Sequence, residues 1–284
     1  MNWIALTALS AISRATYGIA TKTMSNKIQA SAYTQATLLS FVGFIITIFF
    51  SPLLGGLSLD FSKISILPLA LVVLSQGLGN ITYFAALKKL TNGTAQIAFS
   101  SILFFNVILA IAFLGLNLSL VNLLGVIVLA SAILIAVSGK VELNKSGIGI
   151  MLLSAFLFSI FQLASSELSR EVSAATYLAI TFLGAVVVIF ALKSRTVIKD
   201  ISKSNISSII QISTLAALPA VGYFLFSYYA YRIAPEPSKV ALLLTSQVVL
   251  TVILSYFILK ERVHIKRKLL ASVLVVISAA LIKN

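Results

Sequence analysis

The chain contains the stretch YYAYRIAPEPSKVALLLTSQVVLTVILSYFILKE from Tyr228 to Glu261. An apolar segment ends there in a proline-containing turn, and a second apolar segment runs on to a charged end. The stretch YFAALKKLTNGTAQIAFSSILFFNVILAIAFLGL, from Tyr83 to Leu116, has the same outline. A shift of 145 residues aligns the two stretches without a gap and places Ser101 on Ser246. This repeated helix–turn–helix outline predicts a chain built from two related halves.

The composition indicates a membrane protein. Of the 284 residues, 60% are hydrophobic and 10% are charged, and the mean hydropathy is +1.09. Soluble domains carry about a quarter charged residues. A net charge of +14 would suggest a nucleic-acid partner in a soluble protein. Here the lysines and arginines lie mostly between apolar runs, as in cytoplasmic loops, so we expect a lipid bilayer and no nucleic acid as partner.

The inventory of reactive side chains argues against an enzyme. The chain has no cysteine and a single histidine, His264. The seven acidic residues lie at the ends of the apolar runs or between them: Asp60, Glu142, Glu167, Glu171, Asp200, Glu236 and Glu261. A catalytic or metal site needs such groups to gather in a cleft. We therefore expect no catalytic residues, no metal site and no cofactor.

Ten apolar runs approach the length of about 20 residues that spans a bilayer. They cover roughly 3–20, 30–50, 64–86, 94–114, 120–138, 147–165, 174–192, 207–231, 240–259 and 269–282. Lipid cannot satisfy the backbone of an open sheet, so the runs are predicted to be helices. The first run lacks a basic segment before it and a cleavage site after it, which indicates a retained span. The predicted fold is an all-α integral membrane protein with ten transmembrane helices.

The basic residues predict that the two halves are inverted. Residues 1–140 form the first five-helix repeat and 141–284 the second. In the first half, lysines concentrate in the connections 21–29 and 87–93, and in the second half basic residues concentrate in 193–206 and 260–268. An odd number of spans per repeat brings these connections to one side, which is cytoplasmic by the positive-inside rule. Both termini should then face outside. Inverted repeats are a recurrent plan of secondary transporters, with the substrate between the halves.

Arg14 is the most informative polar residue within a span. Ser10, Ser13 and Tyr17 lie on the same helix face. A buried charge in a membrane costs several kcal/mol and is by default functional. An anionic substrate group could neutralise Arg14, since a guanidinium fits a carboxylate or phosphate. The alternative is a side chain that snorkels to the nearby interface.

Other polar side chains within the spans complete a candidate substrate site. Gln76, Asn80 and Tyr83 form one stripe of the third span. Hydrogen bonding between helices is an equally good explanation for each amide. The predicted substrate-binding residues are Arg14, Tyr17, Gln76, Asn80, Tyr83, Gln96, Gln162, Tyr223 and Ser227. Glu261, beside Arg262 at the end of the ninth span, is expected to form a solvated pair.

The five-plus-five plan resembles the drug/metabolite transporter superfamily, and EamA-type carriers in particular. So does the order of Tyr228, Pro235 and an apolar helix that ends in Leu259-Lys-Glu-Arg. The chain departs from that pattern in having Tyr17 before Gly18 where Trp is frequent. The resemblance implies a central cavity lined by the first, third, fourth, sixth, eighth and ninth spans, and often export of metabolites or amino acids.

These features together predict a secondary transporter, a permease or exporter. It would move a small polar metabolite, such as an amino acid or related organic anion, by alternating access. A membrane channel and a membrane-embedded lipid-modifying enzyme are the alternatives. The expected location is the cell membrane, as a multi-pass protein of the cytoplasmic or inner membrane of a prokaryote, either monomeric or homodimeric. No carboxylate is placed at mid-depth of a span, so we expect no obligatory proton coupling.

Overall fold

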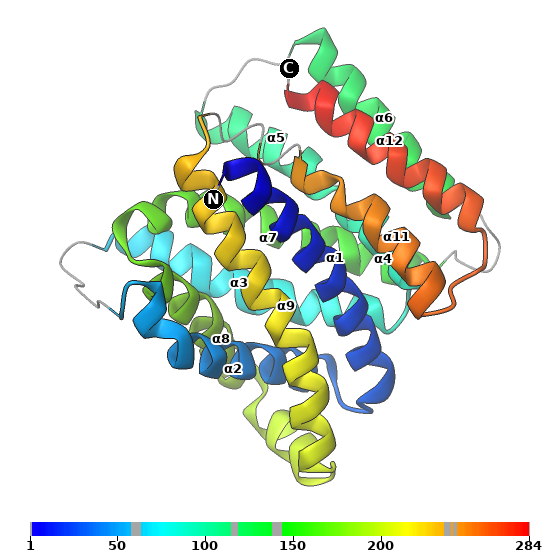
Figure 1. The fold of residues 1–284 in the computed structure, drawn as a ribbon. Coiled ribbons are helices and arrows are strands. Elements are labelled where there is room, and N and C mark those ends of the chain that lie inside the picture. The colour runs from blue at the N-terminus through cyan, green and yellow to red at the C-terminus, as the bar shows by residue number, and fades with distance from the viewer. Residues whose placement is uncertain are drawn as a thin grey trace.

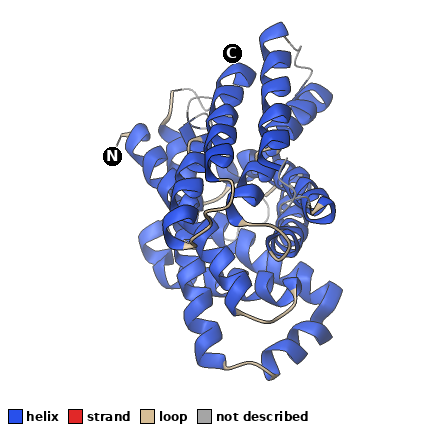
Figure 2. Ribbon diagram, turned by 90° about the vertical axis from the view of Figure 1, so that its right-hand side faces the viewer, coloured by secondary structure: helices blue, strands red, loops and turns tan. Residues whose placement is uncertain are grey.

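The computed structural model of the chain describes residues 2–57, 64–114, 119–137, 144–235, 240 and 243–283. Within those ranges it consists of helices and turns, with no strand (Figure 2). The helices are α1 (Trp3–Lys27), α2 (Ala32–Phe50), η1 (Ser51–Leu54), α3 (Ile66–Leu87), α4 (Asn92–Phe99), α5 (Ile102–Leu114), α6 (Leu120–Val137), α7 (Lys145–Glu171), α8 (Ala174–Ser202), α9 (Ile206–Ile233), α11 (Gln247–Ile258) and α12 (Ile265–Lys283).

Six helical segments are long and apolar enough to cross a membrane. They are Ala32–Leu54, Ile66–Leu87, Asn92–Phe113, Lys145–Glu171, Ala174–Ser202 and Ile206–Ile233, and Leu120–Ala136 and Leu243–Ile258 are shorter apolar helices. The predicted all-helical membrane class is thereby confirmed, while the count of ten spans stays a prediction. α1 and α12 are not among the six; Arg14 lies within α1, and α12 begins with Ile265-Lys-Arg-Lys268.

The helices pack in a reciprocal pattern (Figure 1). α1 packs against α9 and α3 packs against α7, so the first helix of each half contacts the third helix of the other. α2 packs against α8, and α6 lies beside α12 along one edge of the molecule (Figure 1). Glycines allow the closest approaches: a Cβ added at Gly184 would lie 2.5 Å from the Val73 side chain. The core therefore lies between the halves rather than within each.

Two of the predicted spans are broken. The run 94–114 is divided at Ser100–Ser101 into α4 and α5, and the run 240–259 has a turn at Ser246 directly before α11. At the first break the Ser101 N–H donates to the Ala98 carbonyl at 3.1 Å, which tightens the helix into a 3₁₀-like turn. The second break follows the first by 145 residues, the same shift that aligns the two stretches in the sequence.

The predicted boundaries differ most where helices continue past the apolar run. α8 extends to Ser202, ten residues past the predicted end at 192, with a non-helical φ of −149° at Lys193. α1 likewise continues past residue 20 to Lys27. Hydropathy marks where a helix leaves the apolar zone and not where its hydrogen bonding stops, so polar extensions are missed.

Candidate functional site

A small cavity lies between the two halves. Its volume is about 30 Å³, enough for about one water molecule. It is lined by Arg14 and Tyr17 of α1, Phe99 of α4, Ile102 of α5, Phe158, Phe161 and Gln162 of α7, and Tyr223 and Phe224 of α9. No aspartate or glutamate is among these lining side chains.

The guanidinium of Arg14 is enclosed by aromatic rings. Arg14 is 7% exposed. Its Cζ atom lies 4.8 Å from the ring centroid of Tyr17, 5.0 Å from that of Phe99, 5.3 Å from that of Tyr223 and 5.8 Å from that of Tyr83. All four distances fall within the range of cation–π attraction, which is strongest for desolvated cations. The guanidinium thus lies in the cavity wall, which argues against the snorkelling alternative.

Serine side chains fix α1 against α9 and so aim Arg14 at the cavity. The hydroxyls of Ser10 and Ser227 lie 2.6 Å apart, and Ser10 also donates to the Tyr223 carbonyl at 3.1 Å. Ser13 lies against Gly222, where an added Cβ would be 3.2 Å from the serine hydroxyl. The stripe predicted from the sequence is therefore real, and its serines hold the two helices together.

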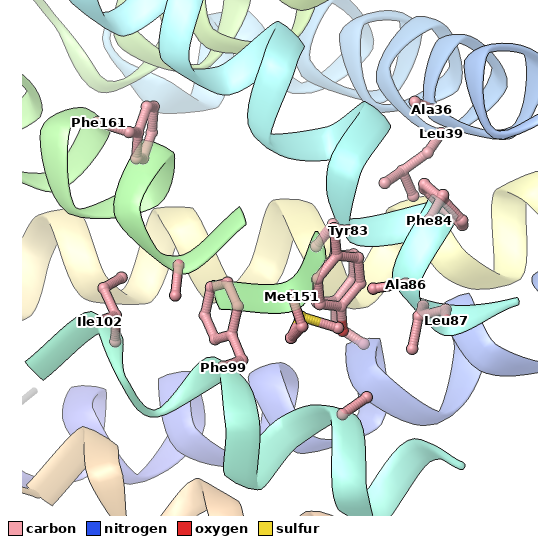
Figure 3. Packing of buried hydrophobic residues seen from close by; sticks show 14 of the residues in the cluster. Ala36, Leu39, Tyr83, Phe84, Ala86, Leu87, Phe99, Ile102, Met151 and Phe161 are labelled. Carbon is pink, nitrogen blue, oxygen red and sulfur yellow. The ribbon is translucent and has the colours of Figure 1, made fainter. Parts of the chain in front are cut away.

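Gln96 holds the Tyr83 ring beside Arg14. The Gln96 amide donates to the Tyr83 hydroxyl at 2.6 Å, and the Tyr83 ring stacks on Tyr17 with centroids 6.2 Å apart. Gly18 makes room for this amide, since an added Cβ would lie 3.2 Å from Gln96 Nε2 and 3.3 Å from Thr251 Cγ2. The close-up in Figure 3 shows Tyr83 and Phe99 within the same buried cluster.

The third-span amides do not line the cavity. Gln76 and Asn80 are 2% and 1% exposed, and the Asn80 amide donates to the Ser40 hydroxyl at 3.3 Å. Their side-chain carbonyl oxygens accept no hydrogen bond. Gln162 lines the cavity and accepts a hydrogen bond from Asn106 at 3.0 Å. Asn80 and Gln162 thus bond across helices, the alternative that the sequence left open.

Of the nine predicted residues, four line the cavity: Arg14, Tyr17, Gln162 and Tyr223. Tyr83 and Gln96 adjoin it through their contacts with Arg14 and with each other, whereas Gln76, Asn80 and Ser227 lie away from its wall. Their role in binding a substrate stays a prediction.

Sequence reasoning missed the apolar lining: Phe99, Ile102, Phe158, Phe161 and Phe224. Apolar residues in a membrane helix carry no signal by themselves. The repeat could have found two of them. The first spans of the halves align at a shift of 144 residues, which matches Leu9-Ser-Ala to Leu153-Ser-Ala, and this shift places Arg14 on Phe158 and Tyr17 on Phe161.

Glu261 caps α4 and is not a solvated pair with Arg262 as expected from the sequence. Its carboxylate accepts hydrogen bonds from the backbone N–H groups of Asn92 at 2.6 Å and Gly93 at 3.1 Å. Lys268 donates to the Thr91 hydroxyl at 3.1 Å, directly before the same helix. An anion at a helix N-terminus satisfies free N–H groups and the positive end of the dipole.

Basic side chains form hydrogen bonds to backbone carbonyls near the N-terminus of α4. The Lys22 ammonium donates to the carbonyls of Leu87 at 2.5 Å and Leu90 at 2.7 Å, at the C-terminus of α3. Lys88 donates to the Ala30 carbonyl. Burial lowers the pKa of Lys88, and the nearby carboxylate of Asp200 opposes that shift. These contacts bind the turn between α3 and α4 to α1 and α2.

The model of the EamA-like transporter family matches residues 1–138 and 145–283. The chain belongs to the EamA-like transporter family. The resemblance stated from the sequence is thereby confirmed. An EamA-like transporter is a transmembrane protein of the drug/metabolite transporter type, so this one is a multi-pass membrane protein and a transporter.

One solved structure similar to this EamA-like transporter is described as a crystal structure of a protein. It has 15% sequence identity and a TM-score of 0.67, and the match covers 98% of this chain and 96% of that chain. At this identity the likeness shows a shared fold over the whole length. A comparison with curated proteins found no match.

Proposed function

We propose that this EamA-like protein is a secondary transporter of a small polar metabolite, such as an amino acid or related organic anion. The observation that supports it most strongly is the buried guanidinium of Arg14, which lies in the wall of the cavity, where none of the described lining side chains is a carboxylate. An intramembrane cation without an anionic partner is costly. An anionic group of a substrate would neutralise it during binding.

The proposed topology has ten spans in two inverted five-helix repeats, 1–140 and 141–284, with both termini outside. Two observations support it. The contact of α1 with α9 is equivalent to the contact of α7 with α3, because each joins the first helix of one half to the third helix of the other. A two-fold axis that relates the halves produces such a pair of contacts. The breaks at Ser101 and Ser246 also fall at equivalent positions of the two halves. The proposed location is the cytoplasmic or inner membrane of a prokaryote.

In this proposal groups of helices on either side of the cavity, each drawn from both halves, move against each other and expose the cavity to one side of the membrane at a time. The serine contacts between α1 and α9 keep Arg14 at a fixed place in the cavity wall. The carboxylate of Glu261 and the ammonium of Lys22 close the end of the bundle beyond α4, and opening toward that end would break their hydrogen bonds. α4 is buried at each of its eight residues, and its last residue, Phe99, lines the cavity.

The test is a thermal-shift screen of the purified protein against a metabolite library, followed by counterflow of each stabilising compound in proteoliposomes. A carrier gives counterflow that saturates with substrate concentration. Flux that rises linearly without saturation would identify a channel instead. Chemical change of the compound during the assay would identify an enzyme.

A further inference from the structure

The cavity has two chemically different walls. Arg14 and Tyr17 of α1, with Tyr223 of α9, supply a cation and two phenolic rings. Phe158 and Phe161 of α7, with the neighbouring Phe224, supply hydrocarbon, and Gln162 adds one neutral amide. A ligand that fits both walls needs one charged group and one apolar face.

The aromatic rings around the cavity form a continuous series that runs from a tyrosine to phenylalanines. Tyr83 lies 5.7 Å from Phe99, measured between ring centroids, and Phe99 lies 5.5 Å from Phe158. Phe158 and Phe161 are 6.1 Å apart, and Phe161 and Phe224 are 5.7 Å apart. The close-up in Figure 3 includes Tyr83, Phe99 and Phe161 of this series. Of the five rings in this series only Tyr83, next to Arg14, carries a hydroxyl, and the ring of Phe224 lies 5.0 Å from that of Tyr223, which also contacts Arg14.

The two halves contribute opposite chemistry at equivalent positions. The shift of 144 residues that places Arg14 on Phe158 also places Tyr17 on Phe161, and all four line the cavity. The half that begins with α1 thus presents a guanidinium where the half that begins with α7 presents a phenyl ring. A symmetric dianion, with an anionic group at both ends, would leave one of its charges against the phenyl rings.

The cavity offers no anionic partner for an ammonium group, since its rings and the Gln162 amide are neutral. None of its lining side chains is acidic. The α-ammonium of an amino acid is separated from the carboxylate by one carbon, so it would lie close to Arg14 without a counter-charge. Like charges at such a distance repel, and the repulsion is strong where water is excluded.

We infer that the preferred substrate is a monocarboxylic acid with an apolar body and no ammonium group. The inference rests on the proposed transport function and narrows it. The guanidinium receives the carboxylate as a planar bidentate pair. The cavity of about 30 Å³ holds the carboxylate end, and the apolar body displaces the half-buried rings of Phe158 and Phe224.

Four matched probes test the inference by isothermal titration in nanodiscs and by counterflow in proteoliposomes. They are 3-phenylpropanoate, L-phenylalanine, which adds an ammonium, propanoate, which lacks the ring, and 2-phenylethylamine, which has no carboxylate. We expect 3-phenylpropanoate to bind at least about tenfold more tightly than L-phenylalanine, whose ammonium is repelled by Arg14, and at least about tenfold more tightly than propanoate, which has no ring to bury against the apolar wall. 2-Phenylethylamine should not compete.

Variants test which part of the probe each wall of the cavity binds. Arg14→Gln should reduce the affinity for 3-phenylpropanoate by about tenfold or more, whereas Arg195→Gln, at an exposed arginine of α8, should not change it. Phe158→Leu should reduce the preference for 3-phenylpropanoate over propanoate. Phe113→Leu, at a 72% exposed ring of α5, is its control. Phe161→Leu replaces Phe158→Leu if the latter lowers the melting temperature.

Binding of L-phenylalanine as tight as that of 3-phenylpropanoate would overturn the inference, and so would failure of all four probes to bind. Either result leaves the proposed function standing if another compound from the library shows saturable counterflow. The proposed function itself fails if no stabilising compound does.

Discussion

The carboxylate of Glu261 lies 2.6 Å from the backbone nitrogen of Asn92 and accepts its hydrogen bond. This contact joins the end of the ninth predicted span to the N-terminus of α4. The C-terminal residue of α4, Phe99, contacts the guanidinium of Arg14 at 5.0 Å. Glu261 therefore positions a short helix whose other end forms part of the cavity wall.

Replacing Glu261 by glutamine should destabilise the protein by about 1–2 kcal/mol, because the charge at the N-terminus of α4 is lost while one acceptor oxygen remains. Glu167→Gln is the matched control, since Glu167 is an exposed acid of α7. The measurement is the melting temperature of each variant in the same detergent. A Glu261→Gln variant that melts with the control would show that the contact does not hold α4.

Lys22→Met should be more damaging than Lys27→Met. The first change leaves the carbonyls of Leu87 and Leu90 without their donor, at about 1–3 kcal/mol for each buried group. Lys27 is exposed in the last turn of the same helix. Thermal melts and limited proteolysis at the turn between α3 and α4 compare the two. Equal melting temperatures would mean that water satisfies both carbonyls.

Gly18→Ala and Gly149→Ala should have opposite effects. An added Cβ at Gly18 would crowd Gln96 and Thr251, whereas one at Gly149 meets nothing within 4 Å. Crowding in a packed core costs about 1–3 kcal/mol, while alanine in an open helix gains up to about 1 kcal/mol over glycine. Melting temperatures and substrate affinity should both fall for Gly18→Ala. A rise in both quantities would show that the Gln96 side chain moves aside without cost when a Cβ is added at Gly18.

Transport should not require a proton. No acidic side chain is among those that line the cavity, and proton-driven carriers generally place a titratable group in their pathway. Counterflow should therefore vary little from about pH 6 to about pH 8, a range that brackets the ordinary pKa of histidine. A pH-sensitive dye trapped in the liposomes should report no substrate-induced proton movement. Proton uptake that one acidic-residue replacement abolishes would refute this.

The orientation of the chain can be tested separately. The basic connections predict that both termini face outside. A carboxy-terminal reporter that is active only in the cytoplasm should stay silent, and one that is active only outside should give a signal. The reversed pair of signals would invert the proposed topology while leaving the helix packing unchanged.

The sequence predicted the helical membrane class and most of the helix positions, because runs such as 207–231 combine length with hydropathy. It did not predict the break at Ser100–Ser101. No proline marks that position, and the apolar run continues across it. The turn is held by tertiary packing around α4, a short helix buried at each of its eight residues, which local propensity does not record.

For the site, the sequence located the cationic wall and missed the apolar one. Arg14 stands out because charge is rare within spans. Phe158 does not, because phenylalanine is ordinary in a membrane helix. Glu261 was misread for a related reason: a carboxylate at the end of a span resembles a solvated group until the N-terminus of another helix is known to meet it.

Counterflow by Arg14→Gln, measured beside a thermal melt, tests whether Arg14 binds an anionic group of the substrate. We predict a loss of affinity of about tenfold to hundredfold, the value of one charge-assisted hydrogen bond, with an unchanged melting temperature because no intramembrane acid is left unpaired. Arg14→Lys keeps the charge without the planar fork and should recover part of the affinity. Unchanged substrate affinity in Arg14→Gln, with the protein folded, would contradict the account.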